Sequence, residues 1–139
     1  MLAQMIKVLI AYVSVTGGVK TNGFMGRFCN MFHRYPPGYP CEVVVCGNGG
    51  PPNSPWIPDE WKVLPRKNDP GWDLSAFIEV ANTIECDLLC CFGESVFFHR
   101  RRWLVPLVKA FEKYPGGMYG IFASNLVVKH LNLTAFAID

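Results

Sequence analysis

MIKVLIAYVSVTGG, residues 5 to 18, is a nearly unbroken apolar run that ends in a loop of small and hydroxyl-bearing residues. Residues 5 to 13 are apolar apart from Lys7 and rich in β-branched side chains, which is typical of a strand buried on both faces. Such a strand needs helices on both sides of its sheet. The stretch therefore predicts a parallel sheet of the α/β class.

The next apolar run, CEVVVCG (residues 41 to 47), has the same character, and a helix is predicted between the two. It follows Thr21-Asn22, which can cap a helix, and PPG at 36 to 38 ends it. The apolar residues that recur there at helical spacing are Phe24, Phe28, Met31 and Phe32. A strand, a helix and a strand in this order predict a right-handed crossover.

The rest of the chain continues the alternation after a long loop, residues 47 to 61, that is rich in Pro and Gly. The next expected elements are a short strand at Lys62 to Leu64 and a helix from Asp73, whose apolar face is formed by Leu74, Phe77, Ile78 and Ala81. A strand at 87 to 92 follows, and then a helix that contains Pro106 and carries the apolar residues Trp103, Leu104, Leu107, Val108 and Phe111. The last expected element is a strand at 117 to 124. We therefore expect one domain, residues 1 to 139, with a mostly parallel, Rossmann-like sheet covered by helices on both faces.

The composition narrows the function classes. The chain is 50% hydrophobic and 17% charged, with a formal net charge of +2, which disfavours a nucleic-acid-binding protein. No apolar run reaches the ~18 to 20 residues of a membrane span. The N-terminus lacks the positive region and small-residue cleavage site of a signal peptide.

The six cysteines predict reduced thiols in the core. Four of them, Cys46, Cys86, Cys90 and Cys91, lie in or beside strand-like runs, and no pair of CxxC motifs offers a zinc site. A reducing, cytoplasmic compartment is expected.

Two loops that follow predicted strands are candidate ligand loops. Residues 14 to 18, Ser-Val-Thr-Gly-Gly, precede a helix, where backbone N–H groups can hold phosphate; a plain turn is the alternative. Gly47-Asn48-Gly49-Gly50 would let a ligand approach the backbone closely, or permit a tight turn. Both loops should lie at the same edge of the sheet.

Three later segments carry polar groups. Arg66 to Asp73 precedes a helix, so its cations could meet a phosphate and Asp73 a sugar hydroxyl, although Asp73 alone fits a helix cap. Gly93-Glu94-Ser95 ends the strand at 87 to 92 and offers one carboxylate. His99 with Arg100-Arg101-Arg102 reads as a solvated helix start, because three consecutive helical residues cannot point one way.

The motifs taken in order resemble the glycosyltransferases of the GT-A, or nucleotide-diphospho-sugar transferase, fold, close to the family-2-like bacterial enzymes. The resemblance covers nearly the whole chain. Its most specific pieces are NDPGWDLSAF and HLNLTAF, and the others are VLIAYVSVTGG, VVVCGNGG, LPRK, DLLCCFGESVFFHRRRWL and GGMYGIFAS. It implies transfer of a sugar from a nucleoside-diphosphate sugar to an acceptor.

The resemblance also implies the residues of a donor site. By position, base and ribose would lie at Tyr12, Val13, Ser14, Gly47 and Asn48, and the diphosphate and sugar near Arg66, Asn68, Asp69 and Asp73. The family's metal-binding Asp-x-Asp motif falls on Gly93, Glu94 and Ser95. Its Mn²⁺ or Mg²⁺ would assist departure of the nucleoside diphosphate as a Lewis acid.

The chain departs from the family in two ways. Glu94 is the only carboxylate where Asp-x-Asp is expected, which makes metal dependence an open question and Glu94 the one expected ligand. Members also continue into an acceptor-binding half that often carries the catalytic base, whereas this chain stops at Asp139. The expectation is a truncated or shortened donor-binding domain whose acceptor is not indicated.

Two further functions remain open at this stage. A non-catalytic domain that associates with a second copy is suggested by Trp56 and Trp61 in the long loop, because aromatic anchors are enriched at interfaces. An FMN binder is suggested by residues 14 to 17, which are similar to the hydroxyl-rich phosphate loop of flavodoxins. The later segments have no place in that third interpretation.

Overall fold

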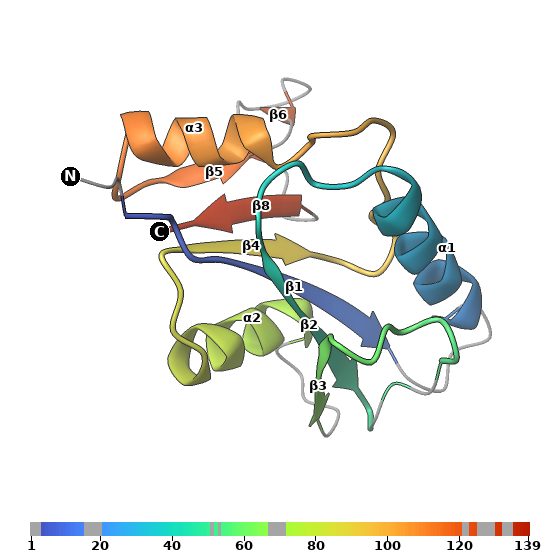
Figure 1. Cartoon of the computed structure of the whole chain (residues 1–139). Coiled ribbons are helices and arrows are strands. Elements are labelled where there is room, and N and C mark those ends of the chain that lie inside the picture. Colours follow the sequence, from blue (N-terminus) through green and yellow to red (C-terminus); the bar gives the residue numbers. More distant parts are fainter. Residues whose placement is uncertain are drawn as a thin grey trace.

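The fold was analysed in a computed structural model, which describes residues 4–15, 21–50, 52, 54–66, 72–120, 123–124, 130–131 and 135–139. From β1 to α3, helices alternate with strands except between β2 and β3, which follow one another directly (Figure 1). The elements are β1 (Val8–Val15), α1 (Thr21–Arg34), β2 (Glu42–Asn48), β3 (Lys62–Arg66), α2 (Trp72–Thr83), β4 (Leu88–Phe92), α3 (Val105–Lys113), β5 (Met118–Gly120), β6 (Ala123–Ser124), β7 (His130–Leu131) and β8 (Ala135–Ile138).

The main sheet has six strands in the order β3-β2-β1-β4-β8-β5. β1 pairs in parallel with β2 and β4, and β3 pairs in parallel with β2. β8 is antiparallel to both of its neighbours, β4 and β5. The predicted α/β class and mostly parallel sheet are confirmed, and the antiparallel β8 is an addition that the sequence pattern did not reveal.

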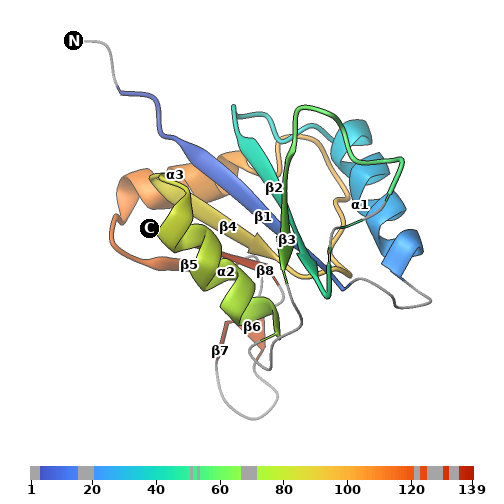
Figure 2. The same ribbon diagram turned by 90° about the horizontal axis from the view of Figure 1, so that it is seen from below.

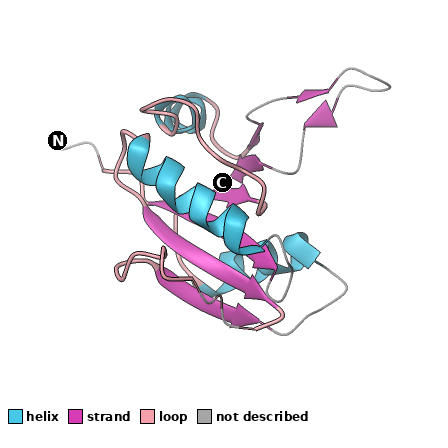
Figure 3. Ribbon diagram, turned by 90° about the vertical axis from the view of Figure 1, so that its right-hand side faces the viewer, coloured by secondary structure: helices cyan, strands magenta, loops and turns pink. Residues whose placement is uncertain are grey.

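Each strand of the sheet centre buries both faces. In β1, Val8, Ile10 and Tyr12 belong to one core, while Leu9, Ala11 and Val13 belong to the other. The first core includes residues of α1 and α3, and the second includes residues of α2. Figure 2 shows α2 in front of the sheet and α3 behind it. Figure 3 is viewed from the side of the molecule on which α1 lies, so this helix is seen in front of the sheet. Helices therefore cover both faces, as predicted.

The predicted apolar face of α2 was wrong in part. Ala76, Phe77 and Val80 are buried against the sheet, whereas Leu74 and Ile78 are 58% and 54% exposed. Ala81 is also exposed. The predicted face and the observed face both have apolar residues at helical spacing. Which of them is buried is therefore decided only by how α2 packs against β1 and β2.

The predicted boundaries differ most near α3 and after it. α3 begins at Val105, not at Trp103, because the N–H groups of Arg102 and Leu104 bond to the carbonyl oxygens of Pro36 and Pro37. Pro106 then stands in the first turn of the helix, where its missing N–H costs little. The strand predicted at 117 to 124 divides into β5 and β6, which pairs with β7 in a separate two-stranded sheet.

The six thiols are free, as the sequence predicted. Cys29, Cys46, Cys90 and Cys91 are buried, and Cys41 and Cys86 are partly buried. Across the described ranges, the structure contains no helix with the length and apolarity needed to span a bilayer.

Candidate functional site

The candidate site lies where the strand order of the sheet reverses. The chain runs outward from β1 through β2 to β3 and then returns to place β4 on the other side of β1. In open α/β sheets, ligands bind outside the carboxyl ends of the strands at such a point. The carboxyl ends of β1 and β4 therefore mark the site, and Val15 and Glu94 lie there.

Glu94 is fastened to the end of β1 by two hydrogen bonds. The Tyr12 hydroxyl donates to the Glu94 carbonyl oxygen at 2.7 Å, and the Val15 N–H donates to Glu94 Oε2 at 3.3 Å. Gly93, just before it, is buried. The Glu94 carboxylate is thus held beside the backbone of β1.

Asp73 brings a second carboxylate to this edge, from the first turn of α2. Burial raises the pKa of Asp73, and the negative charge of Glu94 raises it further. The sequence pattern suggested that Glu94 is the only carboxylate available to a metal, but the structure adds Asp73 at the same edge of the sheet. The fold adds Asp73 because α2 begins at the carboxyl end of β3, on the same edge of the sheet.

The two carboxylates fit a hard divalent cation only with help from a ligand. Mg²⁺ commonly takes one or two carboxylates and completes its octahedron with phosphates and waters. The mutual repulsion of Asp73 and Glu94 is the feature that a cation would relieve. No cluster of three or more His, Cys, Asp or Glu side chains occurs among the described residues. Asn68 and Asp69, also predicted for this site, lie outside the described residues.

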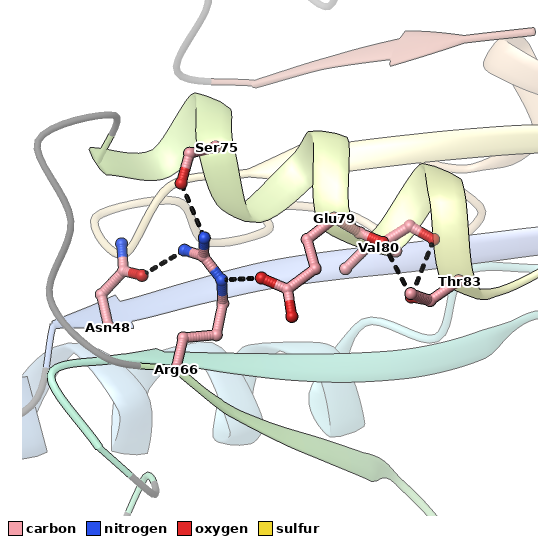
Figure 4. Close-up of polar contacts among 6 residues, drawn as sticks. All are labelled: Asn48, Arg66, Ser75, Glu79, Val80 and Thr83. Atoms are coloured by element: carbon pink, nitrogen blue, oxygen red, sulfur yellow. Dashed lines mark hydrogen bonds and ion pairs between the residues drawn. The ribbon is translucent and has the colours of Figure 1, made fainter.

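Arg66 and Asn48, both predicted donor-site residues, meet in one polar cluster (Figure 4). Arg66 Nη1 donates to Asn48 Oδ1 at 2.6 Å, and Nη2 donates to Ser75 Oγ at 2.6 Å. Arg66 Nε pairs with Glu79 Oε2 at 2.5 Å. The Arg66 side chain is 7% exposed, so its guanidinium braces β2 and β3 against α2 and does not project into solvent.

We expect Arg66→Met to lower the free energy of unfolding by about 2 to 4 kcal/mol, because it removes three side-chain interactions of a buried guanidinium, one of them with the buried Asn48. Urea unfolding measures the change. The matched control is Lys62→Met, which removes the exposed Lys62–Glu42 pair and is expected to cost less than about 1 kcal/mol. Equal losses in the two variants would contradict a bracing role for Arg66.

The β1 residues predicted to contact the base are buried in the strand itself. Tyr12 is 0% exposed and its ring stacks on Phe28 with centroids 3.9 Å apart. Val13 packs toward α2, and Ser14 is 1% exposed. The side chain of Tyr12 therefore positions Glu94, and a ligand would meet this strand through its end at Val15.

Position 47 requires a glycine because the following part of the loop packs closely against its backbone. A Cβ added there would lie 2.1 Å from the Gly50 carbonyl oxygen and 2.6 Å from Pro52 Cδ. The loop folds back because the Gly49 N–H donates to the Arg66 carbonyl oxygen at 3.0 Å. The close approach expected from this loop is thus intramolecular.

Gly47→Ala is expected to destabilise the protein by about 2 to 4 kcal/mol, since backbone atoms must shift to admit the methyl group. Thermal unfolding monitored by circular dichroism checks this. Gly23→Ala on α1 is the control, because a Cβ there meets nothing within 4 Å. An unchanged midpoint for Gly47→Ala would mean that the loop is free to move away.

Arg27 of α1 was not found from the sequence. Its Nη2 donates to the Ser95 carbonyl oxygen at 2.9 Å, and its guanidinium carbon lies 4.1 Å from the centroid of the Phe97 ring. Its buried Nε–H has no partner among the residues described. Arg27 therefore ties α1 to the loop that carries Glu94. The one signal in the sequence is that Arg27 directly precedes Phe28, which was predicted to lie on the apolar face of this helix.

A surface pocket of about 470 Å³ lies elsewhere, at the amino ends of β2 and β3. It is lined by Phe32, Pro37, Tyr39, Cys41, Glu42, Val43, Glu60, Trp61 and Lys62. None of the predicted donor-site residues contributes to it. The pocket therefore lies away from the point where the strand order reverses, and Asp73 and Glu94 lie at that point, not in the pocket.

No protein-family model matches the chain, and a comparison with the curated proteins finds no matching relative. The function of the chain is therefore inferred from the geometry of the site. Its components are two carboxylates from different elements, a backbone N–H at the end of β1 and a braced loop after β2.

Proposed function

We propose that this chain is the nucleotide-sugar-binding domain of a glycosyltransferase with a GT-A-like fold. The observation that carries the proposal is that Asp73 and Glu94 lie at the same edge of the sheet within electrostatic range of each other, so that the pKa of Asp73 is raised by burial and by the charge of Glu94. A divalent cation bound with a diphosphate would offset that repulsion. The site also lies where α/β sheets bind nucleotides.

In this proposal the described residues bind and orient the donor. Asp73 and Glu94 would hold Mn²⁺ or Mg²⁺, whose positive charge would favour departure of the nucleoside diphosphate. Tyr12 and Val15 keep Glu94 in place, and Asn48, held by Arg66, shapes the loop beside base and ribose. Transfer itself would require an acceptor-binding half and a catalytic base from elsewhere.

Calorimetric titration with UDP- and GDP-sugars, with and without Mn²⁺, tests the proposal. Metal-dependent binding of at least one donor is expected. Failure of all of them to bind would refute the function and leave the fold unaffected. Protein that stays yellow after FMN is added and the mixture is gel-filtered would instead favour the flavodoxin-like alternative.

A second candidate function is association with another copy of the chain. Leu74 and Ile78, one turn apart on α2, are more than half exposed, and so is Trp56. Trp61, expected to be exposed, is instead partly buried and packs against the core beside Phe28 and Phe32. Light scattering should then show a dimer that Leu74→Asp dissociates, whereas a monomer at high concentration argues against this candidate.

A further inference from the structure

Two arginine-bearing segments lie side by side at the carboxyl end of α1. Residues 99 to 104, in the connection from β4 to α3, pass beside residues 33 to 38 (Figure 1, orange and cyan). The Arg102 N–H donates to the Pro36 carbonyl oxygen at 2.8 Å, and Trp103 Nε1 donates to the Tyr35 carbonyl oxygen at 2.9 Å. These bonds hold the two segments together.

The backbone at this junction is tightly fitted. Arg102 has φ +61°, in the left-handed region that non-glycine residues rarely adopt. Gly38 faces it with φ +78°, and a Cβ on Gly38 would lie 2.8 Å from Arg102 Cα. The turn that carries the arginines is therefore held in place by its contacts with residues 35 to 38. The sequence had predicted the start of a helix there.

The junction carries four exposed arginines, Arg34, Arg100, Arg101 and Arg102, which we call the arginine face. In the part of the chain that the structure describes, none of these side chains forms an ion pair. Without these four residues the formal charge of the chain, +2, would be negative. Three of them also precede the positive amino end of α3, which opposes helix stability. Arg34 has a role in the fold, because it lies in the last turn of α1 and its guanidinium carbon is 5.5 Å from the centroid of the Tyr35 ring. For the three arginines of the β4–α3 connection, by contrast, the described residues supply no balancing charge.

An aromatic side chain, Phe97, lies in the same β4–α3 connection as three of these arginines. Phe97 is 37% exposed, and its ring lies 4.9 Å from that of His99 by centroids. Basic residues beside an exposed aromatic ring are typical of surfaces that lie on anionic bilayers, where the cations meet headgroups and the ring enters the interface. A nucleic-acid surface is less consistent with a pI of about 8.2.

We propose that the arginine face, together with the exposed ring of Phe97, docks the protein on an anionic lipid surface. The attraction is electrostatic, so it is expected to weaken as salt concentration rises. The ring of Phe97 adds contact area within the interface. This inference does not depend on the nucleotide-binding proposal.

Sedimentation with vesicles tests the proposal, using vesicles of phosphatidylcholine alone and of equal parts phosphatidylcholine and phosphatidylglycerol. The wild-type chain is expected to bind only the anionic vesicles. Arg100→Gln with Arg101→Gln should bind about 30-fold more weakly, because each basic residue at the surface contributes roughly a fivefold factor. Phe97→Ser should also weaken binding at fixed charge.

The control removes the same charge elsewhere. Lys7→Gln with Lys113→Gln acts at the start of β1 and the end of α3, away from α1 (Figure 1), and should reduce binding less than about threefold. Equal weakening by the two double variants would overturn the proposal, as would absence of vesicle binding at low salt. Tighter binding of single-stranded RNA than of vesicles through the same arginines would reassign the surface to nucleic acid.

Discussion

Replacing Glu94 with alanine is expected to abolish Mn²⁺-dependent binding of a nucleoside-diphosphate sugar, with a loss of affinity of about 100-fold or more. The variant removes one of the two carboxylates at the site and the acceptor of the Val15 N–H bond. Asp73 would then face the diphosphate with the cation held by one carboxylate alone. Calorimetric titration with and without Mn²⁺ measures the loss.

Two further variants separate the possible causes of such a loss. Glu94→Gln keeps an oxygen for the Val15 N–H but removes the charge, so it should lose metal dependence while keeping the loop in place. Glu85→Ala removes an exposed carboxylate before the amino end of β4 and should leave binding unchanged. If binding survives Glu94→Ala undiminished, residues 93 to 95 form only a turn at the carboxyl end of β4.

Raising the pH through 9 to 11 is expected to unfold the protein cooperatively. Burial raises the pKa of Cys46 and Cys91 to about 12 and that of Cys29 to about 11, from a usual value of 9.0. The unfolded chain then loses thiol protons before the folded one, so the free energy of unfolding falls as pH rises. Burial raises the pKa of the Tyr12 hydroxyl in the same direction.

The expected slope is steep because several groups act together. Each fully buried thiol contributes up to about 1.4 kcal/mol per pH unit within this window, so Cys46 and Cys91 together give about 3 kcal/mol per unit. Stability from these groups is fully present below pH 9 and is lost through the folded pKa values. Urea unfolding in the presence of a thiol reductant, repeated along the pH series, measures the slope.

The control for the alkaline transition is a variant with fewer buried thiols. Cys46→Ala with Cys91→Ala should be less stable at pH 7 because of lost packing, but its stability should fall less steeply with pH. A slope unchanged from the wild type would assign the transition to other groups. A midpoint that stays constant from pH 9 to 11 would contradict the burial of these thiols.

The sequence predicted the elements better than their faces and partners. Periodicity located β1, β2 and β4 within a few residues, because strands buried on both faces are continuously apolar. Leu74 and Ile78 of α2 were assigned to the core because the helical pattern offered two apolar faces, and packing selected Ala76, Phe77 and Val80. β8 was missed, since a four-residue run at the end of the chain carries too little periodic signal.

The candidate site divides in the same way. Local pattern indicated that the ends of β1 and β4 matter, and it drew attention to Glu94, Asn48 and Arg66. Their roles depended on the fold: Arg66 braces Asn48 and α2, and Gly47 accommodates Gly50. A sequence cannot show these contacts when each residue type also fits a ligand-binding role.

The amino-acid sequence by itself determined the α/β class and the position of the buried strands, because burial on two faces requires runs of apolar residues that are visible locally. Tertiary structure alone decided that Asp73 lies within electrostatic range of Glu94, that Arg27 holds Ser95, and that Arg34 joins the arginines of the β4–α3 connection. These pairs are distant in sequence, so their meeting follows from strand order and crossover direction, which no local pattern specifies.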